Sequence, residues 1–299
     1  MILAGEQISL RTLPAYAQER LAAAMQYPAQ NLEEHRFRLP KLDLDVRMAG
    51  PELAALCEQR FVQRECDEEV GQHATVHALD ATLDGWDAPA GWDTDTGFSS
   101  REFERALEEA GLRGFYHHDA PSWQFFNPAT RTGVHVLPSR MGIPPWEIGS
   151  PMRLFMHWAY AAQGLRLTHA ATLGIGGKGA LMVGASGSGK SGTTLAGLLN
   201  GLQSVGDDYV LLEHGEDVTA HALFRVFKQD DNGLRRVGLR LENPELNWHG
   251  KHEFDAMALM PGAFVRRLKI TAIFLPHVAR LERTEIEPVS AKHAALALA

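Results

Sequence analysis

The sequence predicts an α/β protein in two parts: a smaller α+β region over residues 1–112, and a domain over residues 113–299 that contains a glycine-rich loop. Two observations support this division. The first hundred or so residues mix segments of helical apolar spacing with an alternating, strand-like segment, and they end in a stretch rich in Gly, Asp and Pro. From about residue 115 onwards, short strands alternate with tight turns and helices.

The first part is expected to hold three helices and one extended segment. In the extended segment, the leucines and the valine of LDLDV share one face because side chains alternate along a strand. Ser99 or Ser100 can cap the third helix, and Gly111 follows it as a stop signal. In chain order the segments are PAYAQERLAAAMQY, HRFRLPKLDLDVRM, PELAALCEQRFVQREC and, after the loop LDGWDAPAGWDTDTGFSS, REFERALEEAGL.

The second part is expected to alternate strands with helices. Ser150 can cap a helix over SPMRLFMHWAYAAQGL, with Pro151 in its first turn and Gly164 at its end. A second helix, KSGTTLAGLLNG, follows the glycine-rich loop, and a third begins at SAKHAALALA. The expected strands are SWQFFNP, GVHVLP, LTHAATLGI, GALMVGAS, QSVGDDYVLLE, VTAHALFRVFK, RRVGLRL and ITAIFLPHVA, the last of them buried.

Composition excludes some classes of function. The chain has a formal net charge of −8 and a pI of about 6.0, so it lacks the basic footprint of a nucleic-acid binder. No apolar run approaches the length of a membrane span, and the N-terminus does not read as a signal peptide, so we expect a cytoplasmic protein with no membrane partner. Cys57 and Cys66 fit no metal-binding spacing, which favours two free thiols. The oligomeric state is open, and a homo-oligomer is compatible with the sequence.

The segment GASGSGKS carries the clearest chemistry. Gly184, Gly189, Lys190 and Ser191 fit the pattern G-x-x-x-x-G-K-[ST] at every fixed position. Glycines let the loop direct backbone N–H groups at phosphate oxygens, and the following helix presents its positive end to the same anion. The lysine can reach the β- and γ-phosphates, and the serine hydroxyl can ligate Mg²⁺. The expected strand before the loop and helix after it support a nucleotide-binding loop.

Two adjacent acids, Asp207 and Asp208, follow this loop after room for one helix and a returning strand. Side by side on a regular strand they would point to opposite faces, so they are expected to do different jobs. One could hold Mg²⁺, and the other could accept the proton from an attacking hydroxyl. The alternative is a solvated turn; the position of the pair after a phosphate loop favours the functional interpretation.

The stretch from THAATLGIGGKGALMVGASGSGKS to VGDDYVLLE resembles the catalytic core of the HPr kinase/phosphorylase family, and more closely its HprK-related serine kinase branch. Three elements match in order: His169-Ala170 opening a hairpin, the phosphate loop, and the Asp207-Asp208 pair. The resemblance covers roughly residues 120 to 290 and does not reach the region before about residue 110.

The resemblance implies an HprK/PEP-carboxykinase-like P-loop domain with a mixed, twisted sheet. It also implies ATP and Mg²⁺ as cofactors, and a serine hydroxyl of a protein or peptide as the acceptor. The catalytic residues would be Asp207, Asp208, His169 and Lys190. We assign Ser191 and Asp208 to the metal and Asp207 to the acceptor hydroxyl, although the division between the two aspartates is open. The residues expected to bind the nucleotide are Gly184, Ser186, Gly187, Ser188, Gly189, Lys190, Ser191 and Gly192.

The sequence also departs from the bifunctional HPr enzymes. Gly192 follows the loop serine where those enzymes carry an acidic residue, and their later signature segment and C-terminal docking helices are not found. The resemblance therefore does not extend to HPr as the acceptor or to phosphorolysis. Members of the wider family modify precursor peptides of natural products, including lasso peptides, and that class of acceptor stays open.

Two other functions remain as alternatives: a nucleotide-sensing regulatory module without transfer, and a small-molecule kinase. Lys228 and Lys251 lie where the related branch tends to place a basic residue, but we interpret each as a surface lysine. The pairs His73/His77 and His249/His252 lack a third ligand at clear spacing, so we do not predict a metal site there. The region before about residue 110 could recognise the substrate.

Overall fold

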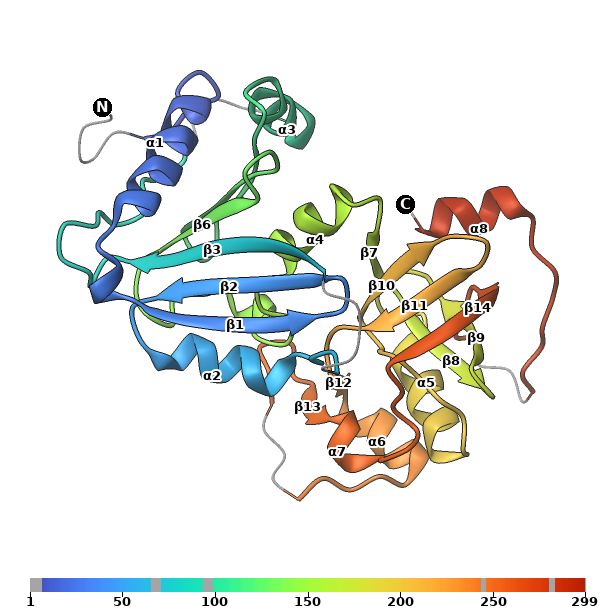
Figure 1. The fold of residues 1–299 in the computed structure, drawn as a ribbon. Helices are drawn as coiled ribbons and strands as arrows, with labels where there is room; N and C mark the ends of the chain where they lie inside the picture. Colours follow the sequence, from blue (N-terminus) through green and yellow to red (C-terminus); the bar gives the residue numbers. More distant parts are fainter. Residues whose placement is uncertain (1–6, 66–70, 94–98, 243–245, 280–282, 299) are drawn as a thin grey trace. The chain divides into compact units, whose positions relative to one another are not determined.

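The computed structural model of the protein describes residues 7–65, 71–93, 99–242, 246–279 and 283–298 (Figure 1). The chain forms two compact units. Unit 1 consists of Met1–Gln59 and Gln63–Gln163, and unit 2 consists of Arg60–Val62 and Gly164–Ala299. Both are mixed α/β structures, and each contains a six-stranded sheet with parallel and antiparallel pairs. Among the described residues, no helix is long and apolar enough to cross a membrane.

The sheet of unit 1 has the order β1-β2-β3-β6-β5-β4. Strand β3 pairs in parallel with β2 and β6, and the remaining pairs are antiparallel. The strands are β1 (Glu33–Leu39), β2 (Leu42–Met48), β3 (Gln72–Asp80), β4 (Arg113–His117), β5 (Ser122–Asn127) and β6 (Thr132–Leu137). The helices are α1 (Leu13–Gln26), α2 (Pro51–Arg60), α3 (Ser100–Glu109) and α4 (Arg153–Ala161), with 3-10 turns η1 (Ala29–Asn31) and η2 (Pro145–Glu147).

The core of unit 1 forms where α1 and α3 pack on β3, β5 and β6. Trp123 is fully buried in it, with its ring stacked on Phe125 at 5.2 Å and on Phe103 at 6.3 Å between centroids. Helix α3 begins as predicted: Ser99 and Glu102 form a reciprocal capping box, and Gly111 follows the helix with a φ of +73°. Burial of aromatic rings and the capping box of α3 thus stabilise the part of unit 1 built from α1, α3, β3, β5 and β6.

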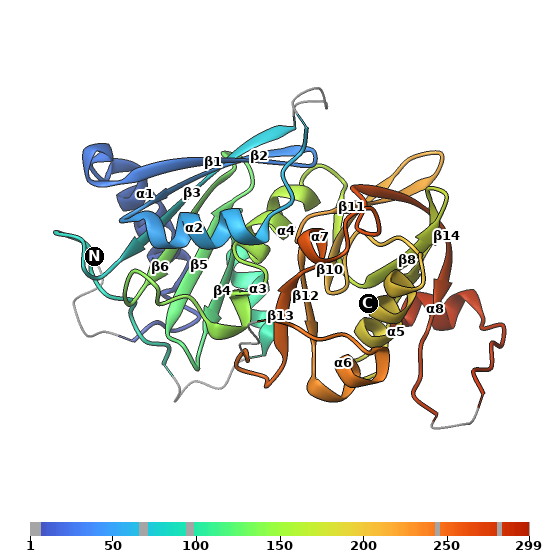
Figure 2. The ribbon, with the colours of Figure 1, turned by 90° about the horizontal axis from the view of Figure 1, so that it is seen from below.

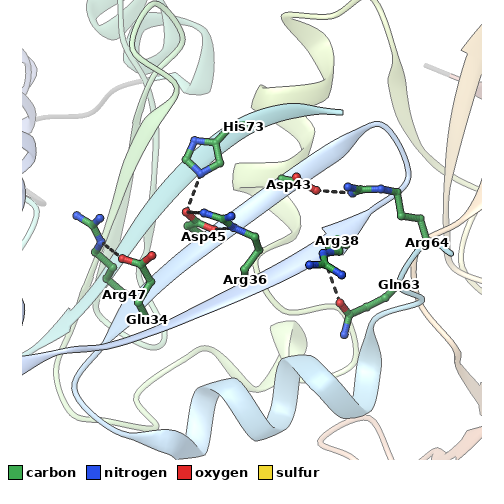
Figure 3. A network of polar contacts seen from close by, with 9 residues as sticks. All are labelled: Glu34, Arg36, Arg38, Asp43, Asp45, Arg47, Gln63, Arg64 and His73. Atoms are coloured by element: carbon green, nitrogen blue, oxygen red, sulfur yellow. Dashed lines mark hydrogen bonds and ion pairs between the residues drawn. The ribbon is translucent and has the colours of Figure 1, made fainter. Parts of the chain in front are cut away.

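Beside this core, the strands β1, β2 and β3 carry a network of ion pairs (Figure 3). Asp45 is buried, and it accepts two hydrogen bonds from Arg36, at 2.7 and 2.8 Å, and lies 2.7 Å from His73 Nε2. Arg64 pairs with Asp43 in the same network. The side chain of His73 is therefore engaged by a carboxylate.

The sheet of unit 2 has the order β7-β10-β11-β14-β9-β8, in which β14 and β9 run parallel and the other neighbours are antiparallel. A separate two-stranded sheet pairs β12 with β13. The strands are β7 (Arg166–His169), β8 (Ala171–Ile175), β9 (Lys178–Met182), β10 (Tyr209–His214), β11 (Val218–Ala222), β12 (Val226–Gln229), β13 (His252–Asp255) and β14 (Arg267–Phe274). The helices are α5 (Lys190–Leu199), α6 (Asp231–Val237), α7 (Ala256–Leu259) and α8 (Ala291–Leu298).

The break between the units falls at residues 163/164, whereas the sequence predicted a boundary at 112/113. Strands β4, β5 and β6 belong to unit 1 because β6 pairs with β3 across a long stretch of sequence. The segment VTAHALFRVFK is divided between β11 and β12, which lie in different sheets.

Cys57 is a buried free thiol, and Cys66 lies outside the described residues.

Three local expectations are corrected. RRVGLRL was expected as a strand, but its first three residues end α6, because Asp230 caps that helix on the N–H of Gly233 and Gly238 ends it at a φ of +71°. Helix α4 starts at residue 153 and not at Ser150, which is buried before the helix. Strand β14 was expected to be buried, but most of its side chains are exposed or half-buried although it is hydrogen-bonded on both sides.

Candidate functional site

The glycine-rich loop joins β9 to α5 in unit 2, so the predicted order of strand, loop and helix is present. Three of its glycines have positive φ: Gly184 at +148°, Gly187 at +80° and Gly189 at +101°. These values lie in a region that L side chains rarely adopt, which explains why the motif needs glycine there. Gly189 precedes α5 and no side chain caps the helix, so the N–H groups of its first turn could be satisfied by an anion.

Lys190 is the first residue of α5, and its side chain folds back over the loop. The Nζ atom donates hydrogen bonds to the carbonyl oxygens of Gly184, at 2.5 Å, and Ala185, at 3.2 Å. Only 7% of the residue is exposed, and burial lowers its pKa from the ordinary value. The ammonium group is therefore placed above the loop, where phosphate oxygens would replace carbonyls as its partners.

Asp207 and Asp208 lie in a bend just before β10. The expectation that both acids sit on a regular strand is therefore corrected, and the alternation of a strand does not decide where they point. Their environments differ instead.

Asp207 is almost fully buried, with 4% of the residue exposed. Its Oδ2 accepts a weak hydrogen bond from the backbone N–H of Lys228 at 3.4 Å, whereas its Oδ1 is buried with no hydrogen-bond partner. Burial, reinforced by the neighbouring Asp208 carboxylate, raises the pKa of Asp207 to about 7, against the opposing effects of Lys228 and a hydrogen bond from Ser191. This carboxyl group is poised to exchange a proton near neutral pH.

The pKa of Asp208 is shifted in the opposite direction. Its Oδ1 lies 3.1 Å from His169 Nε2, and its Oδ2 accepts a hydrogen bond from Lys228 Nζ at 3.0 Å. Burial alone would raise the pKa of Asp208, but the contacts with His169 and Lys228 outweigh burial and hold that pKa well below its ordinary value. Asp208 is therefore an ionised carboxylate at any physiological pH.

His169 reaches Asp208 because β7 and β10 are antiparallel neighbours. In their register His169 is the partner of Tyr209, and the two rings stack with centroids 5.2 Å apart. The strand pairing thus brings together His169 and Asp208, which lie nearly forty residues apart in the sequence. His169 contacts Asp208 directly, and the charges of Asp207 and Asp208 act on Lys190 at the loop.

Two side chains of this site, Lys228 and Gln229, were not predicted from the sequence. Lys228 was interpreted as a surface lysine, but its side chain is only 19% exposed and it forms the ion pair with Asp208. Gln229 is buried next to α5, with its Nε2 3.5 Å from the position that a Cβ would take at Gly192. Lys251 is half-buried, and its positive charge contributes to the lowered pKa of Lys190. The available signal for Lys228 was the family resemblance, whose related branch tends to place a basic residue near this position.

The oxygen atoms of this site fit a magnesium ion. Mg²⁺ prefers hard oxygen ligands such as carboxylates and hydroxyls, and Ser191, Asp207 and Asp208 supply them. Two buried oxygens in the site, Asp207 Oδ1 and Ser188 Oγ, have no hydrogen-bond partner, as expected where a ligand supplies one.

The other histidine pairs are engaged elsewhere. His252 Nε2 lies 2.6 Å from Asp231 Oδ1, and His73 Nε2 lies 2.7 Å from Asp45 Oδ2. Over the part of the chain that the structure describes, no three His, Cys, Asp or Glu side chains are grouped as a metal site.

Comparisons with known proteins add little to this geometry. No protein-family model and no curated protein matches the sequence. One matching solved structure is described as the structure of the Hpr(Ser) kinase/phosphatase from Coxiella burnetii, with 22% sequence identity and a TM-score of 0.25 over 36% of this chain. The match spans 63% of that chain, which is less than two thirds of its length. A TM-score of 0.25 does not establish a shared fold.

Proposed function

We propose that unit 2 transfers the γ-phosphoryl group of ATP, in a magnesium-dependent reaction, to the serine hydroxyl of a protein or peptide. The observation that carries the proposal is the pair of adjacent aspartates at the phosphate loop, one with a raised pKa and the other with a lowered pKa. A pair of carboxyl groups whose pKa values are shifted in opposite directions is typical of a site that needs both a proton acceptor and a permanently ionised group. A site for nucleotide binding alone needs no such pair.

The loop would bind the triphosphate. Backbone N–H groups from Gly187 to Ser191 and the ammonium of Lys190 would contact its oxygens, with the positive end of α5 behind them. Lys190 would exchange its two carbonyl partners for the β- and γ-phosphates. These contacts hold the reacting phosphorus in place without covalent chemistry by the protein.

Ser191 and Asp208 would hold Mg²⁺. A metal ligand must be deprotonated, and the depressed pKa of Asp208 meets that requirement, whereas Asp207 is partly protonated near neutral pH. When bound, the metal neutralises charge that develops on the β- and γ-phosphate oxygens. His169 and Lys228 position the Asp208 carboxylate.

Asp207 would serve the acceptor. The acceptor oxygen forms a bond to the γ-phosphorus, the bond from that phosphorus to the bridging oxygen breaks, and ADP leaves with the bridging electron pair. The proton of the acceptor hydroxyl passes to Asp207, whose Oδ1 has no other partner. The pKa of about 7 suits a group that takes up and releases a proton in each cycle. A serine acceptor rests on the family resemblance of the sequence.

The test uses the purified protein, γ-labelled ATP, Mg²⁺ and a lysate of its own source, with Lys190→Ala beside it. A labelled protein or peptide band that appears only with the wild type supports the kinase and identifies the acceptor. Label only in a small molecule would favour a metabolite as the acceptor. Tight ATP binding with no label in any fraction would replace the kinase with a nucleotide-sensing module.

The two aspartates are tested separately. Asp207→Asn and Asp208→Asn should each abolish transfer, because one removes the proton acceptor and the other the metal ligand. Asp208→Asn should also weaken the dependence of ATP binding on Mg²⁺, and Asp207→Asn should not. A fully active double Asn variant would refute the mechanism.

A further inference from the structure

Three residues that precede most of unit 1 in the sequence belong to unit 2. Arg60–Val62 pack there, although the chain on both sides of them lies in unit 1. Phe61 forms an antiparallel bridge with Phe224, Val62 N–H donates to the Leu223 carbonyl at 2.8 Å, and Arg225 N–H donates to the Arg60 carbonyl at 2.9 Å. These bonds fix the short segment alongside the residues that lead into β12.

At one end of this segment, Arg60 contacts a carboxylate of β13. Its NH2 atom lies 3.5 Å from Glu253 Oε2, and both side chains are largely buried, at 21% and 14% exposure. The other oxygen of Glu253 accepts a hydrogen bond from Asn247 Nδ2 at 3.1 Å. Glu253 is therefore held on both oxygens.

Glu253 lies opposite Lys228, the lysine that pairs with Asp208. Strands β12 and β13 are neighbours in the ribbon (Figures 1 and 2). They pair antiparallel, and their register places Lys228 directly opposite Glu253. Side chains opposite each other in such a pair are close enough to interact, and the charge of Glu253 is felt at Lys228. Lys228 thus has two carboxylates within its reach, Asp208 at 3.0 Å and Glu253 across the strand pair.

We propose that Arg60 is a positioning residue of the transfer site: by neutralising Glu253 it leaves Lys228 paired with Asp208. This inference rests on the proposed function of that site. Without Arg60, the largely buried Glu253 carboxylate would lose the cation that the structure places beside it, and an unpaired buried charge is costly. The lysine would then swing towards Glu253, and the site would lose the cation beside Asp208, a charge that stabilises the transfer step.

The test compares Arg60→Ala, Arg60→Lys and the double variant Arg60→Ala/Glu253→Gln in the full chain. A matched control is Arg225→Ala, which breaks the ion pair of Arg225 with Asp255 in the same two-stranded sheet. The readout is ADP formation from MgATP with water as the acceptor. Arg60→Ala should lower kcat about tenfold and leave the KM for ATP within about twofold, because the cation acts on the transfer step. Arg60→Lys should retain most of the rate.

The double variant distinguishes positioning from a structural role. Removing the charge of Glu253 removes the competitor for Lys228, so the double variant should recover most of the kcat lost in Arg60→Ala. If Arg60 only holds the segment in place, the double variant will be as slow as Arg60→Ala or slower, and Arg225→Ala will lose a similar amount. Either of those results overturns the inference.

A crystal structure of Arg60→Ala makes the inference testable without turnover. Lys228 Nζ should lie nearer to Glu253 than to Asp208 in that variant, and the wild-type pairing should be present in the double variant. If Lys228 stays on Asp208 when Arg60 is absent, the inference is wrong whatever the activity. If the wild type forms no ADP above the Lys190→Ala background and labels no acceptor, the proposed function fails, and the crystal structure still decides the role of Arg60.

Discussion

The two aspartates of the site should affect stability in opposite directions when each is replaced by asparagine. Asp207 has a pKa of about 7 in the folded chain and an ordinary value of 3.8. Between those pH values the folded chain keeps a proton that the unfolded chain has released, so stability falls as the pH rises from 3.8 to about 7 and stays low above it. Asparagine has no proton to release, so Asp207→Asn should be more stable than the wild type at neutral and higher pH.

The size of the effect follows from the two pKa values. At about 1.4 kcal/mol for each pH unit between them, Asp207→Asn should raise the free energy of unfolding by about 4 kcal/mol at pH ~8 and by less than about 2 kcal/mol at pH ~5. The gain should therefore grow by roughly 2 to 3 kcal/mol over this range. The assay is urea unfolding of both proteins at the two pH values in magnesium-free buffer.

Asp208→Asn is the matched comparison. Its carboxylate is stabilised in the folded chain by His169 and Lys228, so its contribution to stability is present above the ordinary pKa of 3.8 and is lost below it. The substitution leaves the Lys228 ammonium largely buried without its carboxylate and should cost about 3 kcal/mol at both pH values. An Asp207→Asn protein that is no more stable at pH ~8 than at pH ~5, relative to the wild type, would refute the reasoning.

Three further predictions concern other parts of the chain. Burial lowers the pKa of His135 to about 4, so between that pH and about 6.5 the unfolded chain binds a proton that the folded chain does not. The free energy of unfolding should therefore fall by up to about 3 kcal/mol as the pH drops from about 6.5 to about 4. His135→Phe should reduce this pH dependence, as measured by urea unfolding. Ser99→Ala removes the capping box of α3 and should cost about 1 kcal/mol in the same assay, with Ser99→Thr much less affected. Gly189→Ala places a Cβ at a φ of +101° and 3.3 Å from Val278 Cγ2, so ATP binding measured by calorimetry should weaken about tenfold or more. Gly215→Ala is the control: its new Cβ meets only an ordinary contact, so this variant should bind ATP as the wild type does.

The elements of the site that depend on local sequence were predictable. Glycines at positions of positive φ, a helix start at Lys190 and an apolar strand before the loop all follow from neighbouring residues. The capping box at Ser99 was visible for the same reason, since the residues that form it lie within one turn. A signal of the same kind was available but overlooked at Asp230 and Gly238, which mark the ends of α6.

What could not be predicted depends on pairing between distant strands. The boundary at 163/164 exists because β6 pairs in parallel with β3. The local sequence of neither strand indicates that it pairs with the other. Lys228 reads as an ordinary lysine until β12 brings it to Asp208. A turn at Asp207 and Asp208 was weighed only as a solvated one; the burial of Asp207 depends on the structure around the bend.

The cost of burying Asp207 is itself an argument for function. A carboxyl group that is buried, next to a second carboxylate and without a partner for one oxygen destabilises the fold at neutral pH, and asparagine at this position would remove that cost. Natural proteins accept such costs where activity requires a strained or unsatisfied group, and perturbed pKa values gather at such sites. Asp208, one residue away, shows that the same bend can hold a carboxylate in a fully paired state. The contrast between the neighbours is therefore better explained by two chemical roles than by the needs of folding.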